Sequence, residues 1–163
     1  MIKIFFSAFI LFLFNTSMAA SIQAKSWLIA DGDGHILESE NIDIVQPIAS
    51  ITKLLTVMVV LDSKENLEET VKMKKFKGMF VTRQQLINLA IIHSDNQAAD
   101  MLCKIYRAGY QACIEDMNYK ARQLGMQNTE LYDSTGLDNR NVSSPRDLIK
   151  LLKAAEKYSE IVN

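Results

Sequence analysis

The chain has 163 residues, of which 48% are hydrophobic and 23% charged, and its formal net charge at pH 7 is −1. A domain of this length can bury a hydrophobic core. The near-neutral charge balance, without a pattern of basic residues interleaved with aromatic ones, excludes nucleic acid as an expected partner.

The first 19 residues have the pattern of a secretory signal peptide. Lys3 gives a small positive start, an almost unbroken apolar stretch runs from Ile4 to Phe14, and small residues precede a cleavage point after Ala19. The apolar stretch is shorter than the roughly 18 to 20 residues that a spanning helix needs, which disfavours the alternative of an uncleaved anchor. We expect residues 1–19 to be removed, residues 20–163 to form the domain, and the product to be periplasmic or secreted.

A β-hairpin is expected at the start of the domain. Residues 26–30 and 35–41 flank Asp31-Gly32-Asp33-Gly34, whose residue types favour a turn. The Asp-x-Asp-Gly string also suggests a calcium loop, but the twelfth loop position is Ile42, where a bidentate glutamate is needed. We therefore expect no metal site here.

A long apolar helix follows Pro47 and ends near residues 62–64. Its residues from Leu54 to Leu61 leave no wide polar face, so we expect this helix to be central and packed on most sides. It carries Ser50 and Lys53 near its start.

The remaining elements are expected to be helices. Residues 82–85, Thr-Arg-Gln-Gln, have the spacing of a capping box and open a helix that runs through Ile92. Two further helices are expected over residues 97–107 and 110–124. Ser144-Pro145-Arg146-Asp147 combines an N-cap with a proline at the first helical position, which predicts a last helix to about Lys157.

The main chemical signal is Ser50-Ile51-Thr52-Lys53. Residues i and i+3 of a helix share a face, so the Lys53 amine comes within reach of the Ser50 hydroxyl. Burial and the positive end of the helix dipole both disfavour the charged ammonium, so Lys53 can act as base and Ser50 as nucleophile. The alternative is that Ser50 caps the helix and Lys53 is a solvated side chain, as in most isolated S-x-x-K strings.

A second motif, Ser94-Asp95-Asn96, falls in a short break between helices. Side chains at i and i+2 can point the same way there, so Ser94 can relay a proton to a leaving amine and the Asn96 amide can bind a substrate carbonyl or the lysine. The alternative is capping of the helix that begins near Gln97, because Ser, Asp and Asn are preferred N-cap residues. The two roles are compatible.

Cys103 and Cys113 are the only cysteines of the chain. They fall on two successive predicted helices, and an oxidising compartment would permit a disulfide between them. Two buried free thiols are an equally open alternative. His35 and His93 lie at no ligand spacing from the cysteines, so we expect no metal site there either.

The motifs and their surroundings give the chain a resemblance to a known family. S-x-x-K and S-D-N are two of the three motifs of penicillin-binding proteins and serine β-lactamases. The longer stretches that carry the resemblance are ASITKLLTVMVVLD, HSDNQAADMLCKIY and GYQACIEDMNYKARQLGMQNTELYDSTGLDNRNVSSPRDLIKLL. They resemble the low-molecular-mass penicillin-binding proteins, which are serine-type D-alanyl-D-alanine carboxypeptidases and endopeptidases, and most of all the periplasmic DD-endopeptidases.

The resemblance implies a fold, a reaction and a set of site residues. The implied fold is α+β, of the penicillin-binding-protein and β-lactamase type, with an N-terminal β-hairpin and a helical lobe but without the C-terminal strands. The implied enzyme is a peptidase acting on peptidoglycan stem peptides, with Ser50 as acylated nucleophile, Lys53 as its base, Ser94 as proton relay and Asn96 as substrate-binding amide. No metal or organic cofactor is implied, and β-lactams would acylate the same serine.

The third motif of the family pattern is missing. A Lys-Thr-Gly strand, which in the family binds the substrate carboxylate and supplies an oxyanion-hole donor, occurs nowhere in the 163 residues. The chain is then either a fragment of a full enzyme or a short homologue that completes its fold by self-association, or with a partner strand, at the open sheet edge beside residues 27–30. The alternative function is that of a catalytically impaired or inactive peptidoglycan-binding or regulatory homologue.

Overall fold

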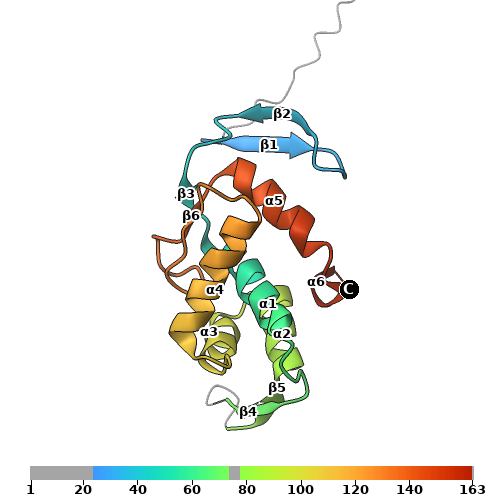
Figure 1. The fold of residues 1–163 in the computed structure, drawn as a ribbon, viewed down its shortest axis with the longest axis vertical. Helices are drawn as coiled ribbons and strands as arrows, with labels where there is room; N and C mark the ends of the chain where they lie inside the picture. Colours follow the sequence, from blue (N-terminus) through green and yellow to red (C-terminus); the bar gives the residue numbers. More distant parts are fainter. Residues whose placement is uncertain (1–23, 74–77, 163) are drawn as a thin grey trace, which may run out of the picture.

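The computed structural model describes residues 24–73 and 78–162, so the expected signal peptide lies outside the described residues. The described part is an α+β arrangement in which helices surround one central helix, with a β-hairpin at one end and a smaller strand pair at the other (Figure 1). None of the helices in these two ranges combines the length and hydrophobicity that a membrane crossing requires.

The expected N-terminal hairpin is confirmed. Strand β1 (Trp27–Ala30) pairs antiparallel with β2 (Ile36–Glu40). The turn is held by the Asp31 carboxylate, whose Oδ1 accepts hydrogen bonds from the backbone N–H groups of Asp33 at 3.0 Å and His35 at 2.8 Å. The side-chain hydrogen bonding of an aspartate to nearby backbone is therefore what closes this turn.

Two further antiparallel strand pairs were not expected from the sequence. They are β3 (Gln46–Pro47) with β6 (Val142–Ser143), and β4 (Thr70–Lys72) with β5 (Phe80–Thr82). Strands of two or three residues carry too little periodicity to be recognised. The β3–β6 pair matters for the site because it ties the segment just before Ser50 to a segment more than 90 residues later.

The apolar helix is central, as its all-round hydrophobicity predicts. It is α1 (Thr52–Asp62), preceded by the 3₁₀ turn η1 (Ala49–Ile51), so Ser50 lies on the turn and Lys53 on the first α-helical turn. The side chains of Leu55, Val57, Met58 and Val60 are fully buried. The other α-helices that pack against α1 are α2 (Arg83–Ile92), α3 (Asn96–Lys104), α4 (Tyr110–Gln123) and α5 (Pro145–Ala155).

The helix starts follow the expected capping chemistry. Thr82 and Gln85 form the reciprocal capping box of α2, and the Ser144 side chain accepts a hydrogen bond from the backbone N–H of Asp147 at the start of α5. Helix α5 ends at Ala155, two residues before the predicted end, and a short helix that was not expected, α6 (Ser159–Val162), follows it.

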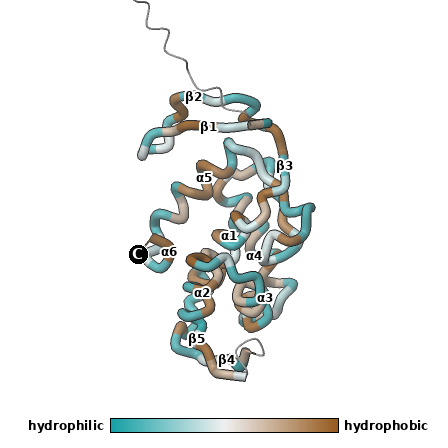
Figure 2. The backbone as a smooth tube through the Cα atoms, turned by 180° about the vertical axis from the view of Figure 1, so that it is seen from behind, coloured by the Kyte–Doolittle hydropathy of each residue, from teal (hydrophilic) through white to brown (hydrophobic). Residues whose placement is uncertain are grey.

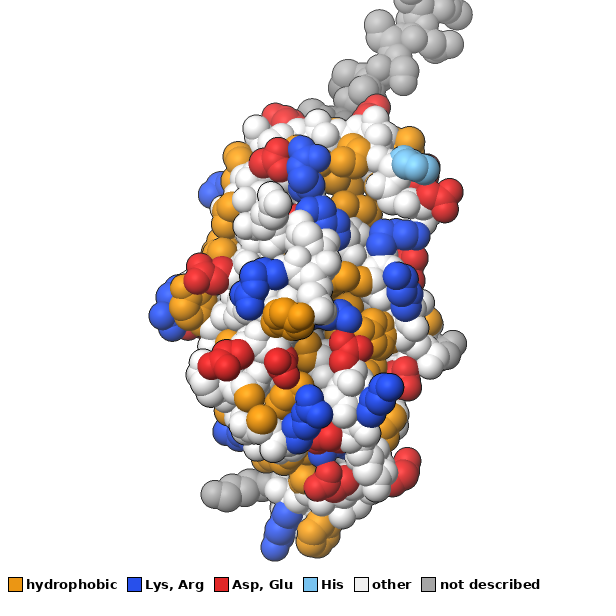
Figure 3. Space-filling model, in the orientation of Figure 1, with side chains coloured by type: hydrophobic (Ala, Val, Ile, Leu, Met, Phe, Trp, Pro, Cys, Tyr) orange, Lys and Arg blue, Asp and Glu red, His pale blue; other side chains and the backbone are white. Residues whose placement is uncertain are grey.

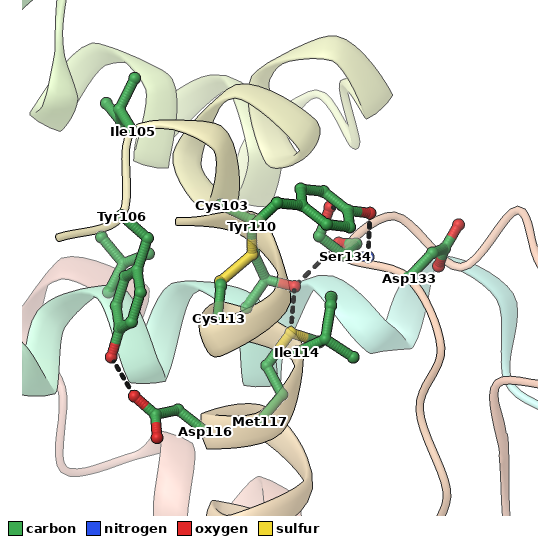
Figure 4. Close-up of a disulfide and its surroundings, with 12 residues drawn as sticks. Cys103, Ile105, Tyr106, Tyr110, Cys113, Ile114, Asp116, Met117, Asp133 and Ser134 are labelled. Carbon is green, nitrogen blue, oxygen red and sulfur yellow. Dashed lines mark hydrogen bonds between the residues drawn. A yellow bond between two sulfur atoms is a disulfide. The ribbon is translucent and has the colours of Figure 1, made fainter. Parts of the chain in front are cut away.

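The two cysteines form a disulfide, which resolves the alternative that the sequence left open. Cys103 of α3 and Cys113 of α4 are both fully buried, and their Cα atoms lie 5.4 Å apart (Figure 4). This separation lies within the usual range for a disulfide. The bond joins the two helices on either side of the 105–109 connection.

Hydrophobic side chains are incompletely covered at the hairpin end. In Figure 2 parts of β1, β3 and α5 are themselves hydrophobic. Figure 3 shows hydrophobic side chains between the charged ones at this hairpin end of the molecule. Large apolar side chains that remain at least 40% exposed there include Ile29, Leu37, Ile51 and Leu152. This end of the molecule therefore offers apolar surface beside the start of α1.

Candidate active site

Ser50 and Lys53 are in direct contact. The Lys53 Nζ donates a hydrogen bond to Ser50 Oγ at 2.8 Å and another to the main-chain carbonyl of Thr135 at 2.8 Å. Lys53 is only 2% exposed, whereas Ser50 is exposed. A buried amine thus lies beneath an accessible hydroxyl, which is the arrangement that removal of a hydroxyl proton requires.

The alternative roles that the sequence allowed for Ser50 and Lys53, a helix cap and a solvated side chain, are wrong. Lys53 is not a solvated side chain, because its surface is almost entirely covered. Ser50 is not a helix cap, because the N-cap positions of η1 and α1 are Ile48 and Ile51 and neither position makes a side-chain cap hydrogen bond.

The ionisation of Lys53 is shifted in the direction that a general base needs. Its pKa is lowered from the ordinary value, chiefly because burial penalises the charged ammonium. The carboxylates of Asp133 and Asp95 act in the opposite direction and only partly offset the burial. Lys53 is also the second residue of α1, where the positive end of the helix dipole further disfavours a cation.

The Ser94-Asp95-Asn96 segment is linked to this pair by the charge of Asp95. The Asp95 carboxylate influences the Lys53 amine and also caps α3, accepting hydrogen bonds from Gln97 N at 2.9 Å and Ala98 N at 3.0 Å. The capping role that the sequence allowed for this motif therefore belongs to Asp95. Helix α3 begins at Asn96, one residue earlier than expected.

Ser94 and Asn96 flank Asp95 in the chain but are not bonded to Ser50 or Lys53 in the part of the chain that the structure describes. Ser94 is exposed and has a left-handed backbone, with φ of 51°, while Asn96 is half-buried. Among the described residues, no hydrogen bond joins either side chain to Ser50 or Lys53. The structure thus brings Ser50 and Lys53 together, whereas within these residues Ser94 and Asn96 make no bond to them and stand on either side of Asp95, whose charge acts on Lys53.

A loop that we did not predict to be part of the site packs against the 3₁₀ turn that carries Ser50. In the loop of residues 133–138, Gly136 has a φ of +83°, and a Cβ there would lie 1.8 Å from the carbonyl oxygen of Ala49. Only a glycine allows this approach to the backbone just before Ser50. The string Asp133-Ser134-Thr135-Gly136, with a turn-forming aspartate and a glycine, was the available signal.

An apolar cleft of about 500 Å³ lies next to Ser50, and we call it the hairpin groove. It lies between β1, the β3–η1 segment and α5, and Ala49 and Ile51 on either side of Ser50 line it. Its main apolar side chains are those of Trp27, Leu28, Pro47, Ile48, Leu148 and Leu152. The groove is therefore an apolar surface that adjoins the accessible serine.

We assign no metal ligands. Within the described residues, Asp31, Asp33 and His35 bring ligand-type atoms within 4.8 Å of one another on the hairpin turn. The Asp31 carboxylate is already occupied by two backbone N–H groups and by His35 Nδ1 at 3.0 Å. These bonds account for the cluster as turn chemistry.

Solved structures establish the fold class. Variants of the Streptomyces K15 DD-transpeptidase superpose with a TM-score of 0.78 at 29% identity, over 87% of this chain and 64% of theirs. Penicillin-binding protein D2 from Listeria monocytogenes, in its ampicillin-bound form, superposes with a TM-score of 0.69 at 26% identity, over 77% of this chain and 58% of that chain. The fold is that of the penicillin-binding DD-peptidases, with the helical lobe and few of the strands, as the resemblance implied.

Sequence relatives establish the family. The chain is 40% identical over 158 residues to a D-alanyl-D-alanine endopeptidase of Escherichia coli (strain K12), and 42% identical over 151 residues to one of Pseudomonas aeruginosa. The alignments cover 88% and 84% of this chain but 51% and 49% of those proteins, so the chain spans about half their length. The family model described as D-alanyl-D-alanine carboxypeptidase matches residues 14–77 and 64–162. This chain belongs to that family of serine peptidases.

Proposed function

We propose that this chain carries the acylating part of a serine-type D-Ala-D-Ala peptidase that acts on peptidoglycan peptides. The observation that carries the proposal is the 2.8 Å hydrogen bond from the buried Lys53 amine to the accessible Ser50 hydroxyl. Burial lowers the pKa of Lys53, which increases the fraction of the neutral base near neutral pH.

The proposed reaction proceeds through an ester on Ser50. Ser50 Oγ attacks the carbonyl carbon of the D-Ala residue, and its proton passes to the neutral Lys53 amine. When the tetrahedral intermediate collapses, the peptide bond breaks and the leaving amine takes that proton from the Lys53 ammonium, relayed by the Ser94 hydroxyl. Water then hydrolyses the ester. In this scheme the Asn96 amide holds a substrate carbonyl.

The names of the relatives favour an endopeptidase over a carboxypeptidase. The relatives at 37 to 42% identity are named D-alanyl-D-alanine endopeptidases, whereas those named carboxypeptidases are at 24 to 29%. We therefore propose that the cross-links between stem peptides are the first substrate class to test, with terminal D-Ala-D-Ala as the second.

Acylation by a β-lactam tests the proposal most directly. The purified chain is incubated with ampicillin and its intact mass is measured. We expect an increase of one ampicillin mass that is lost in Ser50→Ala, and slower acylation in Ser94→Ala. If the folded chain shows no mass increase at any concentration, the proposal fails and the second candidate, a non-catalytic peptidoglycan-binding or regulatory homologue, takes its place.

We also propose that the protein is exported. The buried Cys103–Cys113 disulfide supports an oxidising compartment, since cytosolic thiols are kept reduced. The test is the N-terminus of the protein recovered from the periplasm or medium, which should be Ala20. Recovery in the membrane fraction with residues 1–19 attached would support an uncleaved anchor instead.

The hairpin groove supports a proposal of self-association. Strand β1 pairs within the described residues with β2 alone, and apolar side chains remain exposed beside it. Unpaired edges next to apolar surface favour association. Sedimentation should show a dimer or larger species, and a monodisperse monomer that melts cooperatively would contradict the proposal.

A further inference from the structure

The Lys53 amine is held by two acceptors from distant parts of the chain. One is Ser50 Oγ, which lies on the adjoining turn, and the other is the main-chain carbonyl of Thr135, which is 82 residues further along the chain. Thr135 itself is 6% exposed. The direction in which the amine points therefore depends on where the 133–138 loop holds this carbonyl.

The Asp133 side chain organises that loop. Its Oδ1 accepts hydrogen bonds from Thr135 N at 3.1 Å and Gly136 N at 2.7 Å, and its Oδ2 accepts from Thr135 Oγ1 at 2.8 Å and Asp138 N at 3.2 Å. A carboxylate that accepts several backbone N–H groups fixes the loop around itself. Thr135 therefore donates to the Asp133 carboxylate through both its backbone N–H and its side-chain hydroxyl.

The Asn141 side chain ties the same loop to the start of α1. Asn141 is fully buried, and its Nδ2 donates to Asp133 Oδ1 at 2.8 Å, to the Asp133 carbonyl at 3.0 Å and to Thr52 Oγ1 at 3.1 Å. Its Oδ1 accepts from Tyr132 N at 2.7 Å, and its main-chain carbonyl accepts from Ile48 N at 3.0 Å. Asn141 thereby joins the loop and the start of α1 through its side chain, and the segment just before Ser50 through its main-chain carbonyl.

We propose that Asp133 and Asn141 form a brace that positions the Lys53 amine against Ser50 through the carbonyl of Thr135. Both are positioning residues, since neither touches Ser50. Their role in acylation rests on the proposed function, whereas their hold on Lys53 does not.

The brace has a consequence for the ionisation of Lys53 that a merely structural loop would not have. Among the described residues, the charged groups that act on the Lys53 amine are Asp133 from the loop and Asp95 from the cap of α3, and both raise its pKa. The substitution Asp133→Asn keeps the shape of the side chain but removes its negative charge, one of the two that act on Lys53. The Lys53 pKa should then fall further below its ordinary value. A loop that only loosens would admit water and let it rise toward that value.

The experiment is a ¹³C NMR titration of lysine Cε resonances in the purified full chain, with Lys53 assigned as the signal missing in Lys53→Arg. We expect a lower Lys53 pKa in Asp133→Asn and no change in Asp138→Asn. Asp138 is a matched control because its carboxylate, in the same loop, bonds Arg140 at 2.6 Å and does not act on Lys53. An unchanged or higher pKa in Asp133→Asn overturns the proposal.

A measurement on the unsubstituted chain covers the case in which Asp133→Asn does not fold. The carbonyl ¹³C resonance of Thr135 should titrate with the same midpoint as Lys53 Cε and become flat in Lys53→Arg at that midpoint. A Thr135 resonance that ignores the Lys53 titration in the native chain overturns the proposal.

Neither NMR readout requires catalysis, so failure of the proposed function can be distinguished from failure of the brace proposal. If the chain is acylated by ampicillin, Asp133→Asn should react more slowly at pH values above the Lys53 pKa, because a less basic Lys53 removes the Ser50 proton less readily. The acid limb of its pH–rate profile should also move to lower pH, while Asp138→Asn retains the native rate and profile. If the native chain is not acylated, the proposed function fails and the titrations alone decide the brace.

Discussion

Gly136→Ala tests the close packing of the 133–138 loop against the turn of residues 49–51, which carries Ser50. An alanine at a φ of +83° costs about 1–2 kcal/mol through its backbone alone. Its Cβ would also lie 1.8 Å from the Ala49 carbonyl oxygen, where ordinary contacts begin at 3.4 Å, so the two backbones must separate by about 1.6 Å. Overpacking of this kind costs about 1–3 kcal/mol more, and the expected loss of unfolding free energy is about 2–5 kcal/mol.

Two other glycines separate these contributions. Gly109 has a φ of +86° with nothing within 4 Å of an added Cβ, so Gly109→Ala should lose only the backbone part, about 1–2 kcal/mol. Gly32 lies outside the left-handed region and has equally open space, so Gly32→Ala should change stability by less than about 1 kcal/mol.

The assay is urea unfolding of the oxidised chain, followed by circular dichroism, for the three variants and the native sequence. The expected order of destabilisation is Gly136→Ala, then Gly109→Ala, then Gly32→Ala. If Gly136→Ala and Gly109→Ala lose the same free energy, the loop does not pack against the Ala49 carbonyl and the reasoning is refuted. If the chain is acylated as proposed, slower acylation in Gly136→Ala alone, by about 100-fold, would place the displacement at Ser50.

Two further predictions concern the connection between α3 and α4. Replacing Cys103 and Cys113 together by serine should lower the unfolding free energy by about 2–4 kcal/mol, measured by urea unfolding, and reductant should then have no further effect. Burial, and then the 2.6 Å hydrogen bond to Asp116, raise the pKa of Tyr106 from 10.0 to about 12 (Figure 4). Because the folded state holds this proton more tightly, the contribution is present below pH 10 and lost as the pH rises toward 12. Tyr106→Phe should flatten that alkaline loss of stability, and an unaltered pH dependence would contradict the assignment.

Features set by neighbouring residues could be predicted from the sequence. The hairpin turn depends on the Asp31 carboxylate accepting hydrogen bonds from backbone N–H groups two and four residues later, and the capping box of α2 requires only the spacing from Thr82 to Gln85. The contact between Ser50 and Lys53 follows from the i and i+3 positions on one turn, and the burial of α1 from its lack of a polar face. In each case a short segment contains both partners of the interaction.

Features that join distant segments were decided by the tertiary structure. The carbonyl that orients Lys53 belongs to Thr135, and a main-chain acceptor is present at every residue, so no side-chain pattern marks this one. The pairing of Cys103 with Cys113 required the α3 and α4 backbones to approach, which their spacing allowed but did not demand. The need for glycine at Gly136 arises because the backbone of Ala49 and Ser50 passes against it, and that contact exists only once the chain has folded.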